Sequence, residues 1–230
     1  MAAKTVAALT GGTSVTDVTL NGTATWTNGS QQHSGPVILK ALGQDESSLD
    51  ISLSDGEYAE IRDASSGAPG GEWKLGDKTT PFALHNCWTD AAWFFPPLYY
   101  LFAPSSSGVI LSYLGTENKG GRVLYHLRAW RQESGQAPDI SSMIAKLSSV
   151  DYFIDATSLL PVEMKFQTHP DTDANMSIPV KVTFSNYQDV NGVKVPFHVK
   201  KYVGGHVVLN ITIDSATFNS GLQLSDFSIQ

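Results

Sequence analysis

Three residues with chemically reactive side chains, His85, Cys87 and Asp90, lie close together in the stretch "HNCWTD". A histidine that contacts a cysteine lowers the thiol pKa and makes the thiolate a nucleophile. Such pairs are usually assembled from residues that are distant in sequence, whereas His85 and Cys87 are two positions apart. We therefore interpret Cys87 as a buried, unreactive thiol that packs like a small apolar group. We predict no catalytic residue.

Metal and cofactor chemistry has equally little support in the sequence. The six histidines are scattered, and one cysteine permits neither an intrachain disulfide nor a Cys/His zinc site. The stretch "DTDANMS", residues 171–177, lacks the glycine and the distal glutamate of a calcium loop. The common nucleotide-binding, zinc-protease and serine-hydrolase motifs do not occur. We predict no metal site and no cofactor.

The stretch "WFFPPLYYLF", residues 93–102, contains six aromatic rings and no charge. Pro96 and Pro97 interrupt it, and it is shorter than a membrane-spanning helix. Two interpretations remain open. It is a plug that closes the core of a sheet, or it is a lid or wall over a cavity, where aromatic rings supply large apolar area with few rotatable bonds.

The composition of the 230-residue chain limits the classes of partner. Hydrophobic residues make up 41% and charged residues 16%, so the chain can bury a sizeable core and is not a disordered segment. The formal net charge of −7 and the absence of a lysine/arginine cluster argue against nucleic acid. No stretch reaches the roughly 18 apolar residues of a spanning helix, so we expect no integral membrane protein. The N-terminal stretch lacks the apolar region of a signal peptide.

Two-residue alternation of apolar and polar side chains dominates the chain. It is clear in "VTLNGTATW", "LDISL", "LPVEMKF" and "VVLNITI", and it is typical of antiparallel strands with one buried face. Tight-turn dipeptides separate these runs at 28–29, 55–56, 191–192 and 204–205. The Asn191-Gly192 turn predicts a long hairpin. Pro196 in its second strand is expected at an edge or a bulge, because proline cannot donate a ladder hydrogen bond.

Helical signal is scarce. Residues 4–9 predict the end of an N-terminal helix that stops at Gly11-Gly12. Residues 139–149 predict a second helix with Asp139 as its N-cap. Residues 86–95 predict a short helix that ends before Pro96. With about ten strands expected from the runs and turn signals, the chain is best interpreted as one domain over residues 1–230.

Several stretches resemble the LolA/LolB-like lipoprotein-carrier superfamily of bacterial cell envelopes. "SLSDGEYAEIRDA" resembles two paired strands joined by a Ser-Asp-Gly turn, here Ser54, Asp55 and Gly56. "VDYFIDATSLLPVEMKF" resembles a later hairpin of that family, and "VTFSNYQDVNGVKVPFHVKKY" resembles a hairpin of related envelope proteins. "ITIDSATFNSGLQLSDFSIQ" resembles its C-terminal strand and tail, with Asn219, Leu222, Asp226 and Phe227 at the matching positions.

The resemblance implies a mostly β, LolA-like fold: a strongly curved antiparallel sheet, an incomplete barrel, covered by a few short helices that act as a lid. It also implies a non-enzymatic carrier in the periplasm or cell envelope, whose partner is an apolar small molecule, an acyl chain or a lipoprotein. One departure is clear. An arginine closes the lid in LolA, but the matching stretch here reads Lys40-Ala41-Leu42, and we assign no counterpart. Two rival functions stay open: an envelope-stress sensor or protein-interaction domain on the same scaffold, and an unrecognised enzyme.

We call residues 86–102 the aromatic insert and expect it to lie over the concave face of the sheet with a largely apolar cavity of several hundred Å³ between them. We also expect the hydroxyls of Tyr99 and Tyr100 at a wet opening. The predicted ligand-binding side chains are Trp93, Phe94, Phe95, Tyr99 and Tyr100 of the insert and, chosen by strand parity, Leu20, Trp26, Leu39, Leu53 and Met164 of the sheet.

Overall fold

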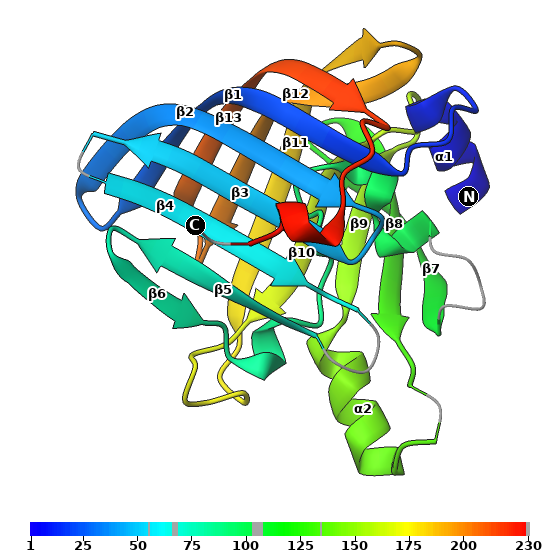
Figure 1. The fold of residues 1–230 in the computed structure, drawn as a ribbon. Coiled ribbons are helices and arrows are strands. Elements are labelled where there is room, and N and C mark those ends of the chain that lie inside the picture. The colour runs from blue at the N-terminus through cyan, green and yellow to red at the C-terminus, as the bar shows by residue number, and fades with distance from the viewer. Residues whose placement is uncertain (55, 66–68, 103–107, 134, 229–230) are drawn as a thin grey trace.

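A computed structural model of the chain describes residues 1–54, 56–65, 69–102, 108–133 and 135–228. In these ranges thirteen strands form one antiparallel sheet in the order β6-β5-β4-β3-β2-β1-β13-β12-β11-β10-β9-β8-β7 (Figure 1). The strands are β1 Asp17–Asn28, β2 Gln31–Leu42, β3 Glu46–Leu53, β4 Gly56–Asp63, β5 Gly70–Leu75, β6 Lys78–Pro81, β7 Val109–Lys119, β8 Arg122–Arg131, β9 Val150–Asp155, β10 Pro161–Thr168, β11 Ile178–Val190, β12 Val193–Val203 and β13 His206–Phe218.

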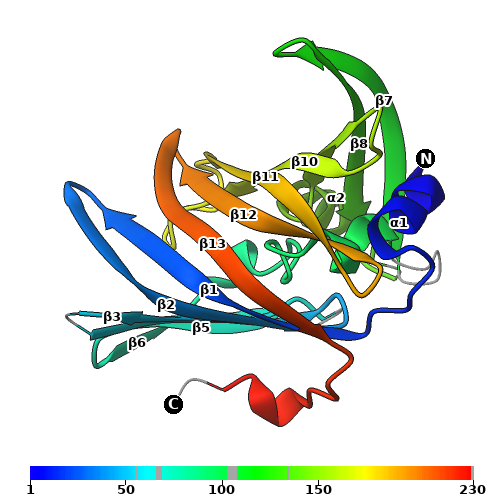
Figure 2. The same cartoon turned by 90° about the horizontal axis from the view of Figure 1, so that it is seen from above.

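The sheet consists of two meanders that join where the first and last strands pair. β1 to β6 run outward on one side, β13 back to β7 run outward on the other, and β1 pairs with β13. β6 and β7 form the two edges, so the barrel is not closed. Figure 2 shows the strong curvature, with β7 and β8 bending away from β1 to β6. The predicted fold class, a curved antiparallel sheet with few helices, is confirmed.

The alternation of side chains gives the sheet an apolar concave face. Leu20 and Ala24 on β1, Leu39 on β2 and Met164 on β10 are fully buried, whereas Asn21 and Thr23 between them are not. A strand points successive side chains to opposite faces, so one apolar face per strand is enough to build a continuous core.

The hairpin predicted at Asn191-Gly192 is confirmed. Val190 pairs with Val193, and the two turn residues have φ angles of 52° and 86°, which a tight two-residue turn requires. Pro196 lies on β12 beyond the last residue that pairs with β13, His198. Its missing N–H is therefore tolerated, as expected for an edge position. Asp55, in the turn matched to the carrier family, falls outside the described residues.

Two α-helices lie in the described ranges, α1 Ala2–Thr10 and α2 Pro138–Leu147. α1 ends at Gly11 in a left-handed conformation, as predicted. The N-cap of α2 is Ala137 and not Asp139, because Pro138 occupies the first helical position, where its fixed φ suits a helix. No described helix is long and apolar enough to cross a membrane.

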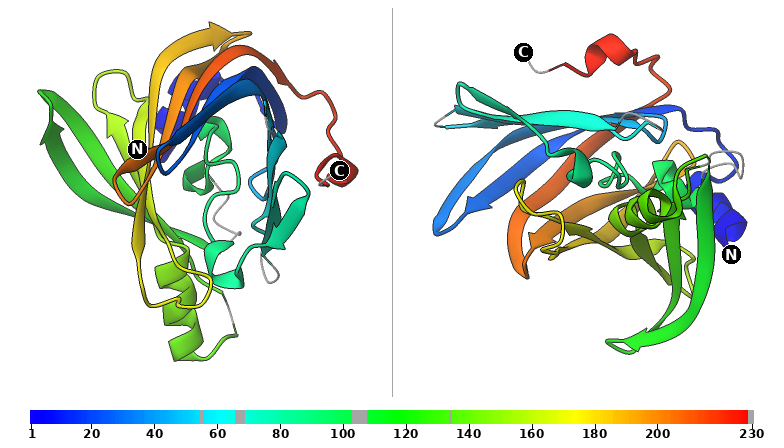
Figure 3. Two further views of the ribbon diagram at one scale, coloured as in Figure 1. Left: turned by 90° about the vertical axis from the view of Figure 1, so that its left-hand side faces the viewer. Right: turned by 90° about the horizontal axis from the view of Figure 1, so that it is seen from below.

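The helix predicted over residues 86–95 is wrong. This part of the chain forms a 3₁₀ helix, Leu84–Asn86, then turns, and then 3₁₀ helices Pro96–Leu98 and Tyr100–Phe102. Asp90 accepts a hydrogen bond from the backbone N–H of Tyr100, so its side chain stabilises a folded-back loop and not a helix. Figure 3 shows this segment, between β6 and β7, inside the arch of the sheet.

Candidate ligand-binding site

The aromatic insert packs into the concave face of the sheet. Trp93, Phe94, Phe95 and Tyr99 are at most 1% exposed. They belong to the same core cluster as the sheet residues Leu20, Leu39 and Met164. Four of the five predicted insert residues and three of the five predicted sheet residues are therefore brought together, as close-packed side chains. The cavity expected between these rings and the sheet is not found there in the described residues; the larger pockets lie at the C-terminal end of the insert.

The hydroxyls of Tyr99 and Tyr100 are not at a wet opening, so that expectation is wrong. Tyr99 is fully buried and donates to the carbonyl of Trp93 at 3.1 Å. Tyr100 is 3% exposed and donates to the carbonyl of Ala64 at 3.0 Å. A buried hydroxyl needs a partner, and a carbonyl of the insert and a carbonyl directly after β4 supply it.

Trp26 and Leu53 pack against the edge of the same core cluster. Both are partly buried and line a small pocket of about 220 Å³ beside the β1–β2 turn. The Trp26 ring stacks on Tyr58, with centroids 5.6 Å apart. The structure therefore divides the predicted site into a buried core and this aromatic pair at its margin.

Two larger pockets lie at the C-terminal end of the insert, next to α1. One, of about 710 Å³, is lined by Pro97, Leu98 and Phe102 together with α1 and the β2–β3 turn. The other, of about 720 Å³, is lined by Tyr100, Leu101 and Phe102 together with α1 and β7. Val6 and Phe102 border both pockets, so the two spaces meet at the edge of the insert.

One buried polar group, which we call the aspartate cluster, joins the insert to β8 and β9. Asp90 is 1% exposed and accepts hydrogen bonds from the Tyr152 hydroxyl and the Tyr100 N–H. Arg131 donates to the Tyr100 hydroxyl and to the carbonyl of Ala64. Burial raises the pKa of Asp90 to about 7, although the two hydrogen bonds act in the opposite direction.

A second buried group, which we call the charged cluster, spans the concavity from β4 to β12. Its members Glu60, Arg62 and Lys201 have side chains that are 5%, 12% and 9% exposed. Arg62 Nε lies 2.5 Å from Glu60 Oε1, and the Lys201 Nζ lies 3.9 Å from Glu60 Oε2. Burial lowers the pKa of Lys201 to about 8, although the negative charge of Glu60 acts to raise it.

The charged cluster also contacts the insert. The Lys201 Nζ lies 4.3 Å from the centroid of the Trp93 ring, which is a cation–π geometry. Arg62 Nη1 donates to the carbonyl of Asn86 at 3.3 Å. Burial by itself would raise the pKa of Glu60, but the charges of Arg62 and Lys201 and the hydrogen bonds from Arg62 and Tyr58 lower it to about 2.

Cys87 is 3% exposed, so its predicted burial is confirmed. Its thiol lies 3.6 Å from the carbonyl of Ala83, while the His85 ring contacts the carbonyl of Pro170 and the ring of His169. Burial raises the thiol pKa, which opposes formation of a thiolate. In the part of the chain that the structure describes, no group of three or more His, Cys, Asp or Glu side chains could hold a metal ion.

Neither buried polar group was predicted from the sequence. A signal for the charged cluster was present, because Lys200 and Lys201 are consecutive on β12 and a strand must direct one of them inward. Tyr58, Glu60 and Arg62 alternate on β4 in the same way. The aspartate cluster had no comparable signal, because it depends on a loop conformation.

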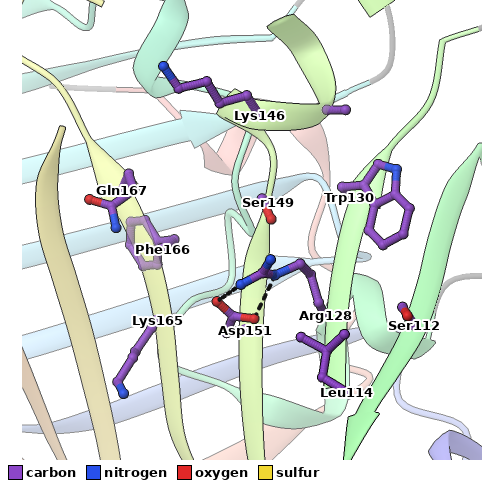
Figure 4. A pocket seen from close by; sticks show the side chains of 11 residues that line it. Ser112, Leu114, Arg128, Trp130, Lys146, Ser149, Asp151, Lys165, Phe166 and Gln167 are labelled. Carbon is purple, nitrogen blue, oxygen red and sulfur yellow. Dashed lines mark hydrogen bonds and ion pairs between the residues drawn. The ribbon is translucent and has the colours of Figure 1, made fainter. Parts of the chain in front are cut away.

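A further pocket of about 640 Å³ lies on the outer face of the sheet, between α2 and strands β7 to β10. Figure 4 shows Trp130, Leu114 and Phe166 around the ion pair of Arg128 and Asp151. Arg128 Nη2 lies 2.9 Å from Asp151 Oδ2. This groove is separate from the concave face and includes none of the predicted site residues.

Solved structures with the same fold include proteins from three bacteria. The chain aligns with a putative outer membrane lipoprotein-sorting protein domain from Vibrio parahaemolyticus at 13% identity and a TM-score of 0.58, over 92% of this chain and 88% of the other. A LolA superfamily protein from Nitrosomonas europaea aligns at 9% identity and a TM-score of 0.59, over 99% of this chain and 96% of the other. A DUF1329 family protein from Desulfovibrio piger aligns at 12% identity and a TM-score of 0.57, over 99% of this chain and 94% of the other. No protein-family model and no curated protein matches the sequence. The chain therefore has a LolA-like fold.

Proposed function

We propose that this chain, as one LolA-like domain over residues 1–230, is a non-enzymatic carrier of an apolar ligand in the periplasm or cell envelope. The ligand is a lipid or the acyl chain of a lipid-modified protein. It binds on the concave face and contacts the ten predicted side chains. It reaches this face when the aromatic insert moves aside.

The observation that carries this proposal is the pair of pockets that meet at Val6 and Phe102. They flank the end of the insert, which enters none of the strand pairs of the sheet. A ligand that starts in these pockets and displaces the insert exchanges one apolar surface for another. Burial of apolar surface contributes about 25 cal/mol per Å², so an acyl chain supplies several kcal/mol before the cost of uncovering the insert.

Native mass spectrometry of the protein purified from its own host tests the proposal directly. We expect an additional mass of one lipid-sized molecule that is released on denaturation. A fluorescent single-chain lipid probe tests it in the purified protein. Consistent absence of bound mass and of probe binding would contradict the carrier function.

A matched pair of variants tests whether the ligand binds at these two pockets. Val6 on α1 borders both pockets, whereas the neighbouring Ala7 is exposed and lines neither. Val6→Asp puts a charge in the apolar wall and is expected to weaken probe binding about tenfold or more, because burying a charge without a partner is unfavourable. Ala7→Asp adds the same charge to the same helix and is expected to leave binding unchanged.

A protein-interaction domain is the second candidate function, favoured by the outer-face groove beside the edge strand β7. Tyr113 and Leu114 of β7 are 54% and 48% exposed. An edge strand can accept a further strand from a partner. Purified protein that carries a bound polypeptide and no lipid, and that loses it on Leu114→Asp, would favour this function over the carrier.

A further inference from the structure

The charged cluster carries an unbalanced positive charge inside the protein. Glu60 contributes one negative charge, whereas Arg62 and Lys201 contribute two positive charges, which leaves a net charge of +1. In the described residues, no ionisable group besides Glu60 and Arg62 is found to shift the pKa of Lys201. A buried ion usually has a neutralising partner, and this lysine shares its one carboxylate with a closer arginine.

The amino group of Lys201 also has unused hydrogen-bonding capacity. An ammonium group has three N–H donors. Within the described parts of the chain, its nearest partners are Glu60 Oε2 at 3.9 Å, which is beyond hydrogen-bond distance, and the face of the Trp93 ring. The side chain is nevertheless nine-tenths buried. It therefore makes no hydrogen bond to a described residue, and its nitrogen keeps some access to solvent.

Displacement of the insert would leave this charge with less compensation. The Trp93 ring belongs to the insert, as does the Asn86 carbonyl that accepts from Arg62. Both contacts are lost if the insert moves aside, and the concave wall then presents two cations beside one carboxylate. An uncharged ligand would cover these cations without compensating them, whereas a ligand with one negative charge would neutralise the cluster.

We propose that the ligand is a single-chain amphiphile with a monoanionic head group, and that the head group binds at Lys201 and Arg62 while the chain lies along the apolar concave face. This inference rests on the proposed carrier function and specifies its ligand. The head group replaces the Trp93 ring at the Lys201 amino group. The apolar wall beside it includes Leu209, which pairs with Lys201 across β12 and β13, and Trp26, which pairs with Leu209.

Two sources of such a head group, a fatty-acid carboxylate and a lipid phosphodiester, are distinguished by matched competitors. Hexadecanoic acid is compared with its methyl ester, and lysophosphatidylglycerol with lysophosphatidylcholine of the same chain length. Each competitor displaces a fluorescent single-chain probe from the full chain below its micelle concentration. We expect at least one anionic competitor to bind about tenfold tighter than its neutral or zwitterionic match, and that pair identifies the source.

Three variants assign the preference to Lys201. Lys201→Met keeps the apolar stem and is expected to remove the tenfold preference, whereas Lys201→Arg keeps it. Lys200→Met removes the neighbouring lysine, which points to the other face of β12, and is expected to change nothing. Circular dichroism confirms that each variant is folded.

The outcomes separate this inference from the carrier function. If neither anionic competitor binds wild-type protein tighter than its neutral or zwitterionic match, or if Lys201→Met keeps the preference, the carrier function stands and the anionic head group is wrong. In that case Lys201 only holds the insert in place. If no competitor and no probe binds, the carrier function fails and this inference fails with it.

Discussion

The two buried polar groups that contact the aromatic insert differ in their balance of charge. In the aspartate cluster, Asp90, Tyr100, Tyr152 and Arg131 all take part in hydrogen bonds between the insert and its surroundings. In the charged cluster, two cations share one carboxylate, and the Lys201 amino group donates no hydrogen bond to any described residue. The first group has the features of a structural attachment. The second has one cation more than it has anions, and an anionic ligand would neutralise that charge.

The largest expected effect concerns the only carboxylate of the charged cluster. Glu60→Gln leaves Arg62 and Lys201 as two buried cations with no anion. We expect the free energy of unfolding to fall by about 3–5 kcal/mol, because removal of one partner from a buried ion pair leaves an uncompensated charge. Urea denaturation measures the change. Glu57→Gln is the control on the same strand, because its pair with Lys74 is exposed and is expected to contribute at most about 1 kcal/mol. Equal effects of the two variants would contradict the difference in burial.

The second effect concerns pH and the aspartate cluster. The pKa of Asp90 is about 7 in the folded state, above the value near 3.9 of an unfolded aspartate. The folded state therefore binds more protons between these values, so its stabilising contribution is present at low pH and is lost as pH rises through about 7. We expect Asp90 to lower the free energy of unfolding by about 2–4 kcal/mol between pH 4 and 7.5.

The variant Asp90→Asn isolates this contribution, because an amide does not titrate. The difference in unfolding free energy between wild type and Asp90→Asn should change with pH in that window. Glu46, whose pKa burial also raises to about 7, contributes with the same sign, and Glu46→Gln removes its part. A wild-type pH profile that Asp90→Asn leaves unaltered would mean that Asp90 is ionised in the fold.

The third expected effect is a change in the free energy of unfolding that has the opposite sign to that of Glu60→Gln. Lys201→Met removes the surplus charge of the charged cluster and keeps Glu60 paired with Arg62. Because burial lowers the pKa of Lys201 from 10.5 to about 8, the lysine is still mostly charged at neutral pH but its charge costs free energy in the fold. We expect Lys201→Met to leave the stability unchanged or to raise it by about 1–3 kcal/mol. Lys181→Met on the neighbouring strand β11, at an incompletely buried site, is the control. Strong destabilisation by Lys201→Met would show that the cluster holds the insert and has no spare capacity.

The difference between the two clusters also explains what the sequence could predict. Strand periodicity and the Asn191-Gly192 turn identify the curved sheet, because both are local patterns that follow from backbone geometry. The same periodicity selects Leu20, Leu39 and Met164 for the concave face. It fails for the insert, where Asp90 and the two prolines favour a folded-back loop that has no period. The contact between Glu60 and Lys201 joins strands that are five positions apart in the sheet, and only the curvature brings them together.

The smallest expected effect tests whether the insert moves as one unit between the two clusters. Cys87, the one cysteine of the chain, is a buried reporter near the charged cluster, because the charge of Arg62 acts on its thiol. Tyr152→Phe removes a hydroxyl that donates to Asp90 at the other cluster. Loss of one such hydrogen bond costs about 1–2 kcal/mol, so opening of a single unit would become about tenfold more frequent.

We therefore expect a thiol reagent to label Cys87 about tenfold faster in Tyr152→Phe than in wild type under native conditions. Tyr113→Phe, which changes an exposed tyrosine of β7, is the control and is expected to leave the labelling rate unchanged. An unchanged labelling rate in Tyr152→Phe would mean that the two ends of the insert open independently, and that a ligand can reach Lys201 while the aspartate cluster stays closed.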